Sequence, residues 1–461
     1  MRAIDTFCER MRSEYRDRLA LFSQGQSLTY GELFASISEW RARLTNCGLG
    51  RGDVVAIEGD FCANGCALFF AAVLECLVIV PFYRKTRESP AAQNRLREAA
   101  RVTHTVTLIG PSEWHLTERA SALPASPLLT AFRERRHPGL IVFTSGSTGD
   151  PKAILHDLEH VLGKFVTPRE PWRTLLFLLF DHFGGINTML ATFGSGGLAV
   201  CVDDRRPVAI CQLIAETQAE LLPTSPTFLN LLMTSGAYVT HDLSSLRLIT
   251  YGTEVMSEVT LAKLKKHFPR TTLKQTYGLS EVGVLRSKSS ANDSVWVKIG
   301  GDGFDVQVRQ GVLWVRSASN MVGYLNAESP FDADGFMCTN DHVEIDGEYV
   351  KILGRKSDVI NVGGQKVFPA EVESVLLEID GVLEATVRGR KHPIMGQVAE
   401  AQIAVRSDVD VNLLIDRVRQ HCVGRLERYK IPVAFRVREV SDMHSQRFKK
   451  DRRDNDGYQP Q

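Results

Sequence analysis

The chain has 461 residues, which is more than one compact core usually holds and enough for two or three domains. Hydrophobic residues make up 44% of the chain and charged residues 24%, the balance of an ordinary globular protein. The formal net charge of +1 gives no electrostatic reason to expect nucleic acid or an anionic membrane as a partner.

Cysteine usage and hydropathy give expectations about location. The nine cysteines are scattered, and the closest pair, Cys62 and Cys66, has no complementary pair of metal ligands, so we expect reduced thiols in a cytoplasmic protein. The N-terminus is charged throughout, so no secretory signal is expected. The most hydrophobic stretch, residues 67–82, is too short for a membrane span and predicts a buried helix leading into a strand that Pro81 breaks.

Short apolar strands alternate with helices through the first 250 residues. Residues 28–33 predict a strand end followed by a helix start, and apolar residues at three- and four-residue spacing carry the helix through Trp40 and Leu44. Buried strands are predicted at residues 54–57, 175–180, 198–202 and 246–251. This alternation predicts α/β layers with largely parallel sheets.

The pattern changes after Trp296. Turns rich in Gly and Asp predict a hairpin-rich β unit with strands at residues 306–308, 312–315 and 343–345. Polar residues 354–358 form the candidate hinge, and helices are predicted at 369–377 and 411–422. We therefore expect an α/β fold with two domains. Residues 1–354 would form a large N-terminal domain of layered α/β subdomains with a small β-unit, and residues 355–461 a small mobile α+β C-terminal domain.

The most informative segment is residues 144–152, TSGSTGDPK, which follows the apolar run at 140–143. Its hydroxyls and backbone N–H groups can surround phosphate oxygens, although the spacing is not that of a Walker loop. The segment resembles the phosphate loop of the ANL superfamily of acyl-adenylate-forming enzymes, which includes acyl-CoA synthetases, peptide-synthetase adenylation domains and luciferases. The resemblance implies that ATP is bound by Thr144, Ser145, Gly146, Ser147, Thr148, Gly149 and Lys152.

A second motif, TYGLSE at residues 276–281, resembles the nucleotide-binding turn of the same superfamily. The resemblance implies that Tyr277 lies against the adenine ring with Gly278 in the same turn, that the Ser280 hydroxyl lies near the α-phosphate, and that Glu281 binds Mg²⁺. The residue types suit these roles, because an aromatic face stacks on a base and a carboxylate is a hard oxygen ligand.

Two shorter segments also resemble parts of the nucleotide site. Gly252, Thr253 and Glu254 follow a predicted strand and resemble the turn on the adenine side. Asp341 resembles the Asp that binds the ribose hydroxyls, a role that suits an acceptor-only carboxylate. Asn340 stands where the family usually carries Gly, a mild change because both residues tolerate positive φ.

Residues 354–373 resemble the hinge and the following loop of acyl-CoA ligases. The resemblance implies that Arg355 meets ribose or phosphate and that Ser357 is the pivot, where relatives often carry Asp or Lys. A small pivot residue can absorb a large change in φ and ψ. Gly363 and Gly364 would form the acceptor tunnel, since glycine lets an acceptor's arm pass close to the backbone.

The catalytic lysine of the family lies in a C-terminal T-x-x-G-K motif followed by basic residues. Here the corresponding run is HSQRFKKDRR, residues 444–453. Aligning the terminal arginines places Lys449 at the catalytic position and Phe448 where Gly is usual. Lys450 is the neighbouring candidate, and a solvated basic tail is the alternative without a function.

Residues 180–187, FDHFGGIN, resemble the F-H-x-G-G-x-N stretch of acyl-CoA ligases, in which the His lines the acid pocket. A register shifted by one residue would instead place Asp181 against the ammonium of an amino-acid substrate. The first register predicts an apolar or aromatic acid, bound by His182, Phe183, Gly184, Ile186 and Phe228.

The resemblance implies that a carboxylic acid and ATP form acyl-AMP and pyrophosphate. The acid is already ionised at neutral pH, so catalysis requires charge stabilisation rather than a general base. The expected catalytic groups are Lys449, Ser280 and Glu281, the last holding Mg²⁺. The acyl group would then pass to the thiol of coenzyme A or a carrier-protein arm, or to an amine such as an amino acid, as in coronafacic acid ligase-like relatives. A non-catalytic nucleotide-binding relative, with Asn340, Ser357 and Phe448 as signs of decay, is the alternative of a different class.

Overall fold

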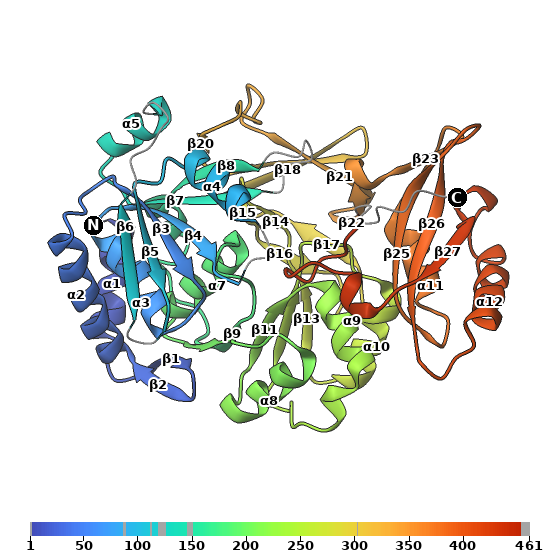
Figure 1. The fold of residues 1–461 in the computed structure, drawn as a ribbon, viewed down its shortest axis with the longest axis horizontal. Helices are drawn as coiled ribbons and strands as arrows, with labels where there is room; N and C mark the ends of the chain where they lie inside the picture. The colour runs from blue at the N-terminus through green and yellow to red at the C-terminus, as the bar shows by residue number, and fades with distance from the viewer. Residues whose placement is uncertain are drawn as a thin grey trace.

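The computed structural model describes residues 2–85, 89–110, 113–118, 126–144, 151–301 and 303–452. A large N-terminal α/β domain is followed by a smaller α+β domain, which lies at the right of Figure 1. The predicted fold class is confirmed. The boundary between residues 354 and 355 stays a prediction, although β22 (Tyr349–Arg355) ends there and the sheet of the small domain begins at Ile360.

The first sheet of the large domain has seven strands, six of them parallel and one antiparallel at the edge. In spatial order they are β13 (Thr272–Gln275), β12 (Leu248–Tyr251), β11 (Leu221–Thr224), β9 (Arg173–Leu176), β10 (Leu198–Cys201), β1 (Leu19–Ser23) and β2 (Gln26–Thr29). The carboxyl ends of parallel strands lie at one edge of a sheet, the usual place for a ligand in an α/β fold.

The second sheet also has seven strands, with four parallel strands at its centre. In spatial order they are β20 (Gly323–Tyr324), β8 (Lys152–Asp157), β7 (Gly139–Thr144), β4 (Val78–Tyr83), β3 (Val54–Gly59), β5 (His104–Leu108) and β6 (Trp114–Glu118). The β7–β8 hairpin brackets the phosphate-loop sequence, because Thr144 ends one strand and pairs with Lys152 at the start of the next.

Helices pack between the two sheets, and their side chains form one core with strands of both, including Leu21 of β1 and Ile57 of β3. These helices are α1 (Ala3–Ser13), α2 (Tyr30–Asn46), α3 (Ala63–Leu74), α6 (Leu158–Gly163) and α7 (Phe183–Gly194). The predicted start of α2 is a capping box. The Thr29 hydroxyl accepts from the Glu32 N–H, and the Glu32 carboxylate accepts from the Thr29 N–H.

Other helices cover the outer faces of the two sheets. On the first sheet these are α8 (Pro207–Thr217), α9 (Pro226–Ser235) and α10 (Glu258–His267). On the second sheet they are α4 (Pro90–Ala99) and α5 (Pro127–Glu134).

The hairpin-rich unit forms a third, antiparallel sheet of six strands. In spatial order they are β16 (Ser287–Ser289), β17 (Trp296–Ile299), β22, β21 (Met337–Asp346), β19 (Val312–Ser317) and β18 (Phe304–Arg309). A two-stranded hairpin, β14 (Gly278–Leu279) with β15 (Gly283–Val284), precedes it.

The small domain has its own core around a five-stranded sheet and two helices. Its strands are β24 (Gln365–Val367), β23 (Ile360–Val362), β26 (Gly396–Val405), β25 (Val382–His392) and β27 (Ala434–Val437), and its helices are α11 (Pro369–Leu376) and α12 (Val411–Val423). The tail after β27 returns to the large domain beside α9, seen in red in Figure 1.

Two strand predictions were wrong in extent. The strand expected at 175–180 ends at Leu176, because the Phe177 carbonyl accepts from the buried Arg205 guanidinium at 2.7 Å and strand pairing stops. Pro81 does not break its strand, since β4 continues to Tyr83. The pairing of β4 with β7 involves Val78 and Ile79, so Pro81 lies beyond the residues that need an N–H on that side.

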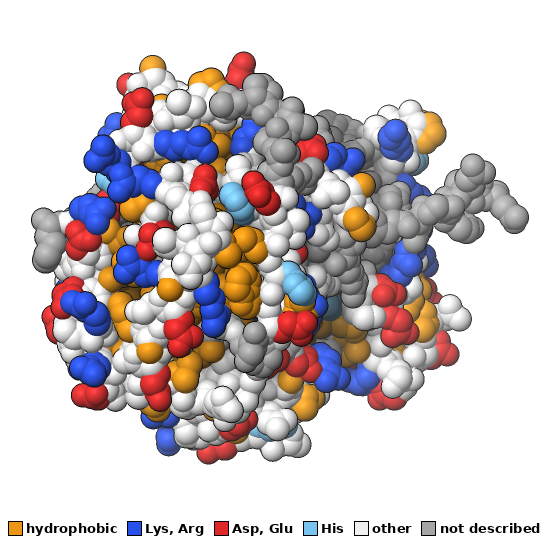
Figure 2. Space-filling view, turned by 60° about the vertical axis from the view of Figure 1, so that its left-hand side comes forward, with side chains coloured by type: hydrophobic (Ala, Val, Ile, Leu, Met, Phe, Trp, Pro, Cys, Tyr) orange, Lys and Arg blue, Asp and Glu red, His pale blue; other side chains and the backbone are white. Residues whose placement is uncertain are grey.

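Positive and negative side chains are interspersed on the face shown in Figure 2. All nine cysteines are free. Within the residues that the structure describes, no helix is both long enough and apolar enough to span a membrane.

Candidate active site

A cavity of about 1000 Å³ lies between the first sheet, α7, the third sheet and the C-terminal tail. Part of its wall follows the carboxyl ends of β11, β12 and β13. It is lined by these residues of the predicted site: Thr144, Lys152, His182, Phe183, Gly184, Gly252, Thr253, Tyr277, Gly278, Ser280, Glu281, Arg355 and Lys449. A smaller cavity of about 360 Å³ shares several of these residues and is also lined by Glu254 and Asp341.

The turn after β13 is held in shape by backbone constraints and one buried histidine. A Cβ on Gly278 would lie 2.7 Å from the Gly283 carbonyl oxygen, so only glycine fits there. The His156 ring lies 2.6 Å from the Ser280 carbonyl through Nε2, and burial lowers the pKa of His156 to about 4. The neutral ring must therefore carry its proton on Nε2 and donate it, which fixes the Ser280 backbone at the cavity wall.

Tyr277 and Asp341 form a buried polar pair beside this turn. The Tyr277 hydroxyl donates to Asp341 Oδ2 at 2.6 Å, and Arg355 Nε lies 3.4 Å from Asp341 Oδ1. Burial raises the pKa of Asp341, and the Arg355 charge opposes that effect. Asn340, before the aspartate, has a φ of +59°, the conformation for which glycine or asparagine is suited.

Glu281 and Lys152 meet at Tyr324. Tyr324 donates a 2.8 Å hydrogen bond to Glu281 Oε1, and Lys152 Nζ lies 5.0 Å from the centre of the Tyr324 ring. One Glu281 oxygen is therefore oriented by the protein, while the carboxylate remains at the cavity wall. Within the described residues, no group of three or more His, Cys, Asp or Glu side chains could hold a metal by itself.

In the turn after β12, Gly252 and Thr253 line the larger cavity, whereas the Glu254 carboxylate contacts other protein groups. A Cβ on Gly252 would lie 2.6 Å from the Thr276 carbonyl oxygen, so glycine allows the two strand ends to approach, and Thr253 adopts a positive φ of +72°. The Glu254 carboxylate is engaged with protein, accepting from the Thr227 hydroxyl at 2.6 Å and from the Lys450 N–H at 2.7 Å. Glu254 thus fastens the C-terminal tail to α9.

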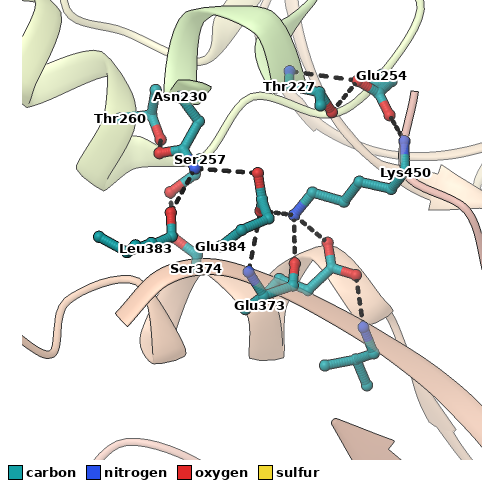
Figure 3. Close-up of polar contacts among 12 residues, drawn as sticks. Thr227, Asn230, Glu254, Ser257, Thr260, Glu373, Ser374, Leu383, Glu384 and Lys450 are labelled. Carbon is teal, nitrogen blue, oxygen red and sulfur yellow. Dashed lines mark hydrogen bonds and ion pairs between the residues drawn. The ribbon is translucent and has the colours of Figure 1, made fainter. Parts of the chain in front are cut away.

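The two candidate lysines have different surroundings. Lys449 lines both cavities, and burial lowers its pKa to about 8. The Lys450 side chain points instead at the small domain, as Figure 3 shows. Its Nζ lies 3.0 Å from Glu373, 3.2 Å from Glu384 and 2.7 Å from the Ala385 carbonyl. These contacts occupy Lys450 and leave Lys449 facing the cavity.

The tail is also anchored on both sides of Lys449. Phe448 has a φ of +49°, which explains why the family usually carries Gly at this position. Its ring packs 5.4 Å from the rings of Phe177 and Phe228, and the Ser225 hydroxyl donates to its carbonyl at 2.6 Å. Arg447 forms an ion pair of 2.9 Å with Asp181.

The part of the cavity away from the nucleotide turn lies between α7 and the first sheet. One helical face of α7 lines it, with Gly184, Asn187, Thr188, Ala191, Thr192 and Ser195 at three- and four-residue spacing. The opposite wall consists of alternate residues of the strands, including Thr174, Leu221, Leu248, Thr250 and Lys274. His182 caps α7 through Nδ1, and burial lowers its pKa well below the usual range, so the ring is neutral.

Two expectations about the acid pocket need correction. Phe228 and Ile186 do not line the cavity, because both are buried in hydrophobic cores. Asp181 pairs with Arg447, which leaves no support for the shifted register. Polar and apolar side chains both line this wall, including Thr174, Leu221 and Lys274.

Gly363 and Gly364 do not line either cavity. They form the turn between β23 and β24, with φ of +56° and +85°. An acceptor tunnel at these glycines would therefore need another orientation of the small domain.

Ser145, Gly146, Ser147, Thr148 and Gly149 lie outside the described residues. Sequence reasoning missed Tyr324, Arg447, Lys274 and the polar face of α7. Only the α7 face carried a signal, because residues 184, 187, 188, 191, 192 and 195 follow a helical period.

The model of the AMP-binding enzyme family matches residues 77–325, more than half of the chain, and that of the AMP-binding enzyme C-terminal domain matches residues 371–449. The chain belongs to the AMP-binding enzyme family. The predicted membership of the ANL superfamily is confirmed, and the protein is an acyl-adenylate-forming acid ligase.

Two similar proteins are CoA ligases. The 2-succinylbenzoate–CoA ligase of Bacillus subtilis (strain 168) is 26% identical, with 91% of each chain covered. The 3-[(3aS,4S,7aS)-7a-methyl-1,5-dioxo-octahydro-1H-inden-4-yl]propanoyl:CoA ligase of Rhodococcus jostii (strain RHA1) is 28% identical, and the match covers 64% of this chain and 60% of that ligase.

Solved structures share the fold. The anthranilate CoA ligase AuaEII in complex with anthranoyl-AMP has a TM-score of 0.81 and 18% identity, with 95% of this chain and 93% of that chain covered. The amide bond synthetase McbA from Marinactinospora thermotolerans has a TM-score of 0.76 and 22% identity, with 95% of each chain covered.

Proposed function

We propose that this enzyme activates a carboxylic acid with ATP and Mg²⁺ and then transfers the acyl group to a thiol, that of coenzyme A or a carrier-protein arm. The observation that carries the first step is that the Lys449 ammonium lines the same cavity as Tyr277, Glu281 and His182. That arrangement brings a cation, a nucleotide turn, a metal-binding carboxylate and an acid pocket to one space.

The nucleotide would bind at the carboxyl ends of β11 to β13. Tyr277 and Gly278 would meet the adenine beside Gly252 and Thr253, and Asp341 with Arg355 would meet the ribose. Asp341 is already oriented by the Tyr277 hydroxyl, so its free lone pairs need no reorganisation to accept two hydroxyl donors. Thr144, Lys152 and residues 145–149 would surround the phosphates.

A Mg²⁺ ion fits Glu281. This carboxylate lines the cavity and has one oxygen held by Tyr324, and Mg²⁺ commonly uses one or two carboxylates together with phosphates and water. Bound there, the metal would neutralise phosphate charge. Lys449 would stabilise the charge that develops as the acid's carboxylate attacks the α-phosphorus and pyrophosphate leaves, and the Ser280 hydroxyl would donate near the same phosphate.

The second step would use another orientation of the small domain, with residues 1–354 and 355–461 moving as separate units about Ser357. This residue lies in a short 3-10 helix, Lys356–Asp358, that links the two domains and is partly exposed. Rotation would withdraw Lys449 and bring the Gly363–Gly364 turn to the cavity. The positive φ of both glycines suits a turn without side chains, along which an acceptor's arm can pass.

Pyrophosphate release from ATP and Mg²⁺ tests the first step, across a panel of carboxylic acids and with hydroxylamine present to trap acyl-AMP. Acid-dependent release together with a hydroxamate is expected. Coenzyme A, a carrier protein and amino acids are then added in separate arms. A thioester supports the proposal, whereas an amide with an amino acid would assign an amine as the acceptor instead.

A further inference from the structure

We propose that the acid carries a second anionic group, most simply a carboxylate, at the end away from the carboxylate that is activated, and that Lys274 binds it. This inference rests on the proposed adenylation and names the substrate class of the same cavity.

The strand register places Lys274 away from the nucleotide turn. Pro223, Thr250 and Lys274 are neighbours across β11, β12 and β13, and all three line the cavity. Thr276 lies two residues further along the same strand direction, beside Gly252 and the adenine turn. A two-residue step along a strand covers about 6–7 Å. Lys274 therefore lies deeper in the acid-binding part of the cavity than the nucleotide turn does.

The Lys274 charge has no counterion. Within the described part of the chain, its ammonium forms neither a hydrogen bond nor an ion pair, although the residue is partly buried. Burial lowers the pKa of Lys274, and the like charge of Arg169, which lines the same cavity, lowers it further. Glu170, which lies on the same lining, is ion-paired with Arg247 at 3.5 Å. A partly buried cation without a counterion is favourable for an anionic ligand.

Other polar groups on the same walls also have no partner. The hydroxyls of Thr174 and Thr224 are buried, with residue exposures of 1% and 3%, and among the residues that the structure describes they form no hydrogen bond. Most buried polar groups in proteins are hydrogen-bonded, so two unpaired hydroxyls in one cavity indicate a ligand with acceptor atoms. On the facing helix α7, Asn187 Oδ1 accepts from Lys164 at 2.6 Å, which fixes that amide at the wall.

A plain alkyl or aryl acid would bury these groups without compensation. It would cover Lys274 and the Thr174 hydroxyl without supplying a negative charge or a hydrogen-bond acceptor. An acid with a distal carboxylate would pair with the ammonium and accept from a hydroxyl. A hydrogen bond to a charged group corresponds to roughly a 10- to 100-fold difference in affinity.

The test compares stable acyl-AMP mimics that differ only at the distal end. For each chain length from five to ten carbons, one acyl-sulfamoyl adenosine ends in a carboxylate and its partner ends in the methyl ester. Dissociation constants are measured by calorimetry with the full-length wild-type protein, and pyrophosphate release is measured with the corresponding free acids. At the length that fits, the carboxylate mimic is expected to bind about 10- to 100-fold more tightly, with the difference in the free acids appearing in KM.

Variants assign the effect to Lys274. Lys274→Met is expected to abolish the preference, and Lys274→Arg to retain most of it. Lys263→Met, which removes an exposed lysine of α10, is the matched control and should leave the preference unchanged.

The outcomes separate the inference from the function on which it rests. If both mimics of every pair bind equally well and more tightly than AMP, the second anionic group is ruled out while adenylation stands. If neither binds better than AMP, the cavity is not an acid site and the proposed function fails as well. A preference that survives in Lys274→Met would also overturn the assignment.

Discussion

Arg447 of the C-terminal tail and Asp181, two residues before α7, are joined by an ion pair of 2.9 Å. The pair connects the segment that carries Lys449 to the loop before α7, so it stabilises the position of the tail in which Lys449 lines the cavity. The second oxygen of Asp181 is buried and has no hydrogen-bond partner within the described segments, which makes Arg447 its main compensation.

Disrupting that pair should affect the two half-reactions differently. We expect Arg447→Gln and Asp181→Asn each to slow pyrophosphate release, and the double variant to be no slower than the worse single one. A coupling of about 0.5–3 kcal/mol is typical of residues in contact. Acyl transfer from synthetic acyl-AMP should be unchanged. Additive losses would show that the pair does not act as a unit.

Lys449→Ala should lower the rate of adenylation by roughly 10²–10³-fold, because one pre-placed cation is lost from the charge that develops at the phosphate. Transfer from synthetic acyl-AMP should persist, since Lys449 has no proposed role in that step. Pyrophosphate release at the wild-type rate would remove the catalytic assignment of Lys449.

Lys450 is expected to matter for stability rather than chemistry. Lys450→Met leaves Glu384 buried without its cation and weakens the compensation of Glu373, and breaking a buried pair typically costs about 3–5 kcal/mol. The remaining ion pair between Arg452 and Glu373 should keep the loss at the low end of that range. Thermal denaturation measures it, with Lys449→Ala as the matched comparison that should melt close to wild type. The reverse order would exchange the roles of the two lysines.

The pH dependence of adenylation should report Lys449. Only the ammonium form stabilises phosphate charge, and burial lowers the pKa of Lys449 to about 8 from an ordinary value of 10.5. Since kcat/KM reports the free enzyme, it should fall as the pH rises through 8. Lys449→Arg keeps its charge, so in this variant the fall should move to higher pH. A wild-type profile that stays flat to about pH 9.5 would contradict this assignment.

Glu281→Gln should raise the Mg²⁺ concentration needed for half-maximal activity and lower the adenylation rate by about 10²-fold or more. The amide has the size of the carboxylate but lacks its charge. Tyr324→Phe is the control, because it keeps the carboxylate and removes one hydrogen bond, so its effect should be smaller. Equal effects of the two variants would indicate that orientation, rather than charge, is what Glu281 provides.

The sequence predicted the elements whose signals are local. The helix start within residues 28–33, the β–α alternation and the nucleotide turn around Tyr277 depend on residues close together in the chain. The residues that line the cavity beside α7 could not be predicted in this way, because its walls come from α7 and from four strands that are separated in sequence. Phe228 was assigned to the pocket by composition, but its neighbours Phe177 and Phe448 place it in a core.

The sequence spacing could not decide between Lys449 and Lys450, because the side chains of adjacent residues extend in different directions. That direction depends on Glu373 and Glu384, which lie more than sixty residues earlier. The end of the strand at 173–176 could not be predicted from the hydrophobic pattern either, because it depends on the hydrogen bond from Arg205 to the Phe177 carbonyl.

The aromatic contact of Phe448 has a kinetic consequence. If the small domain rotates for acyl transfer, the Phe448 ring must move away from Phe177 and Phe228. The apolar surface of these rings then becomes exposed to water. The departure of the ring would then be an activated event, and until it occurred the mixed anhydride would stay sheltered from hydrolysis. A relative with glycine at this position has no ring to displace, so its small domain would rotate without this barrier. In this chain the lifetime of the activated intermediate would then depend on Phe448, whose backbone has a positive φ of +49°.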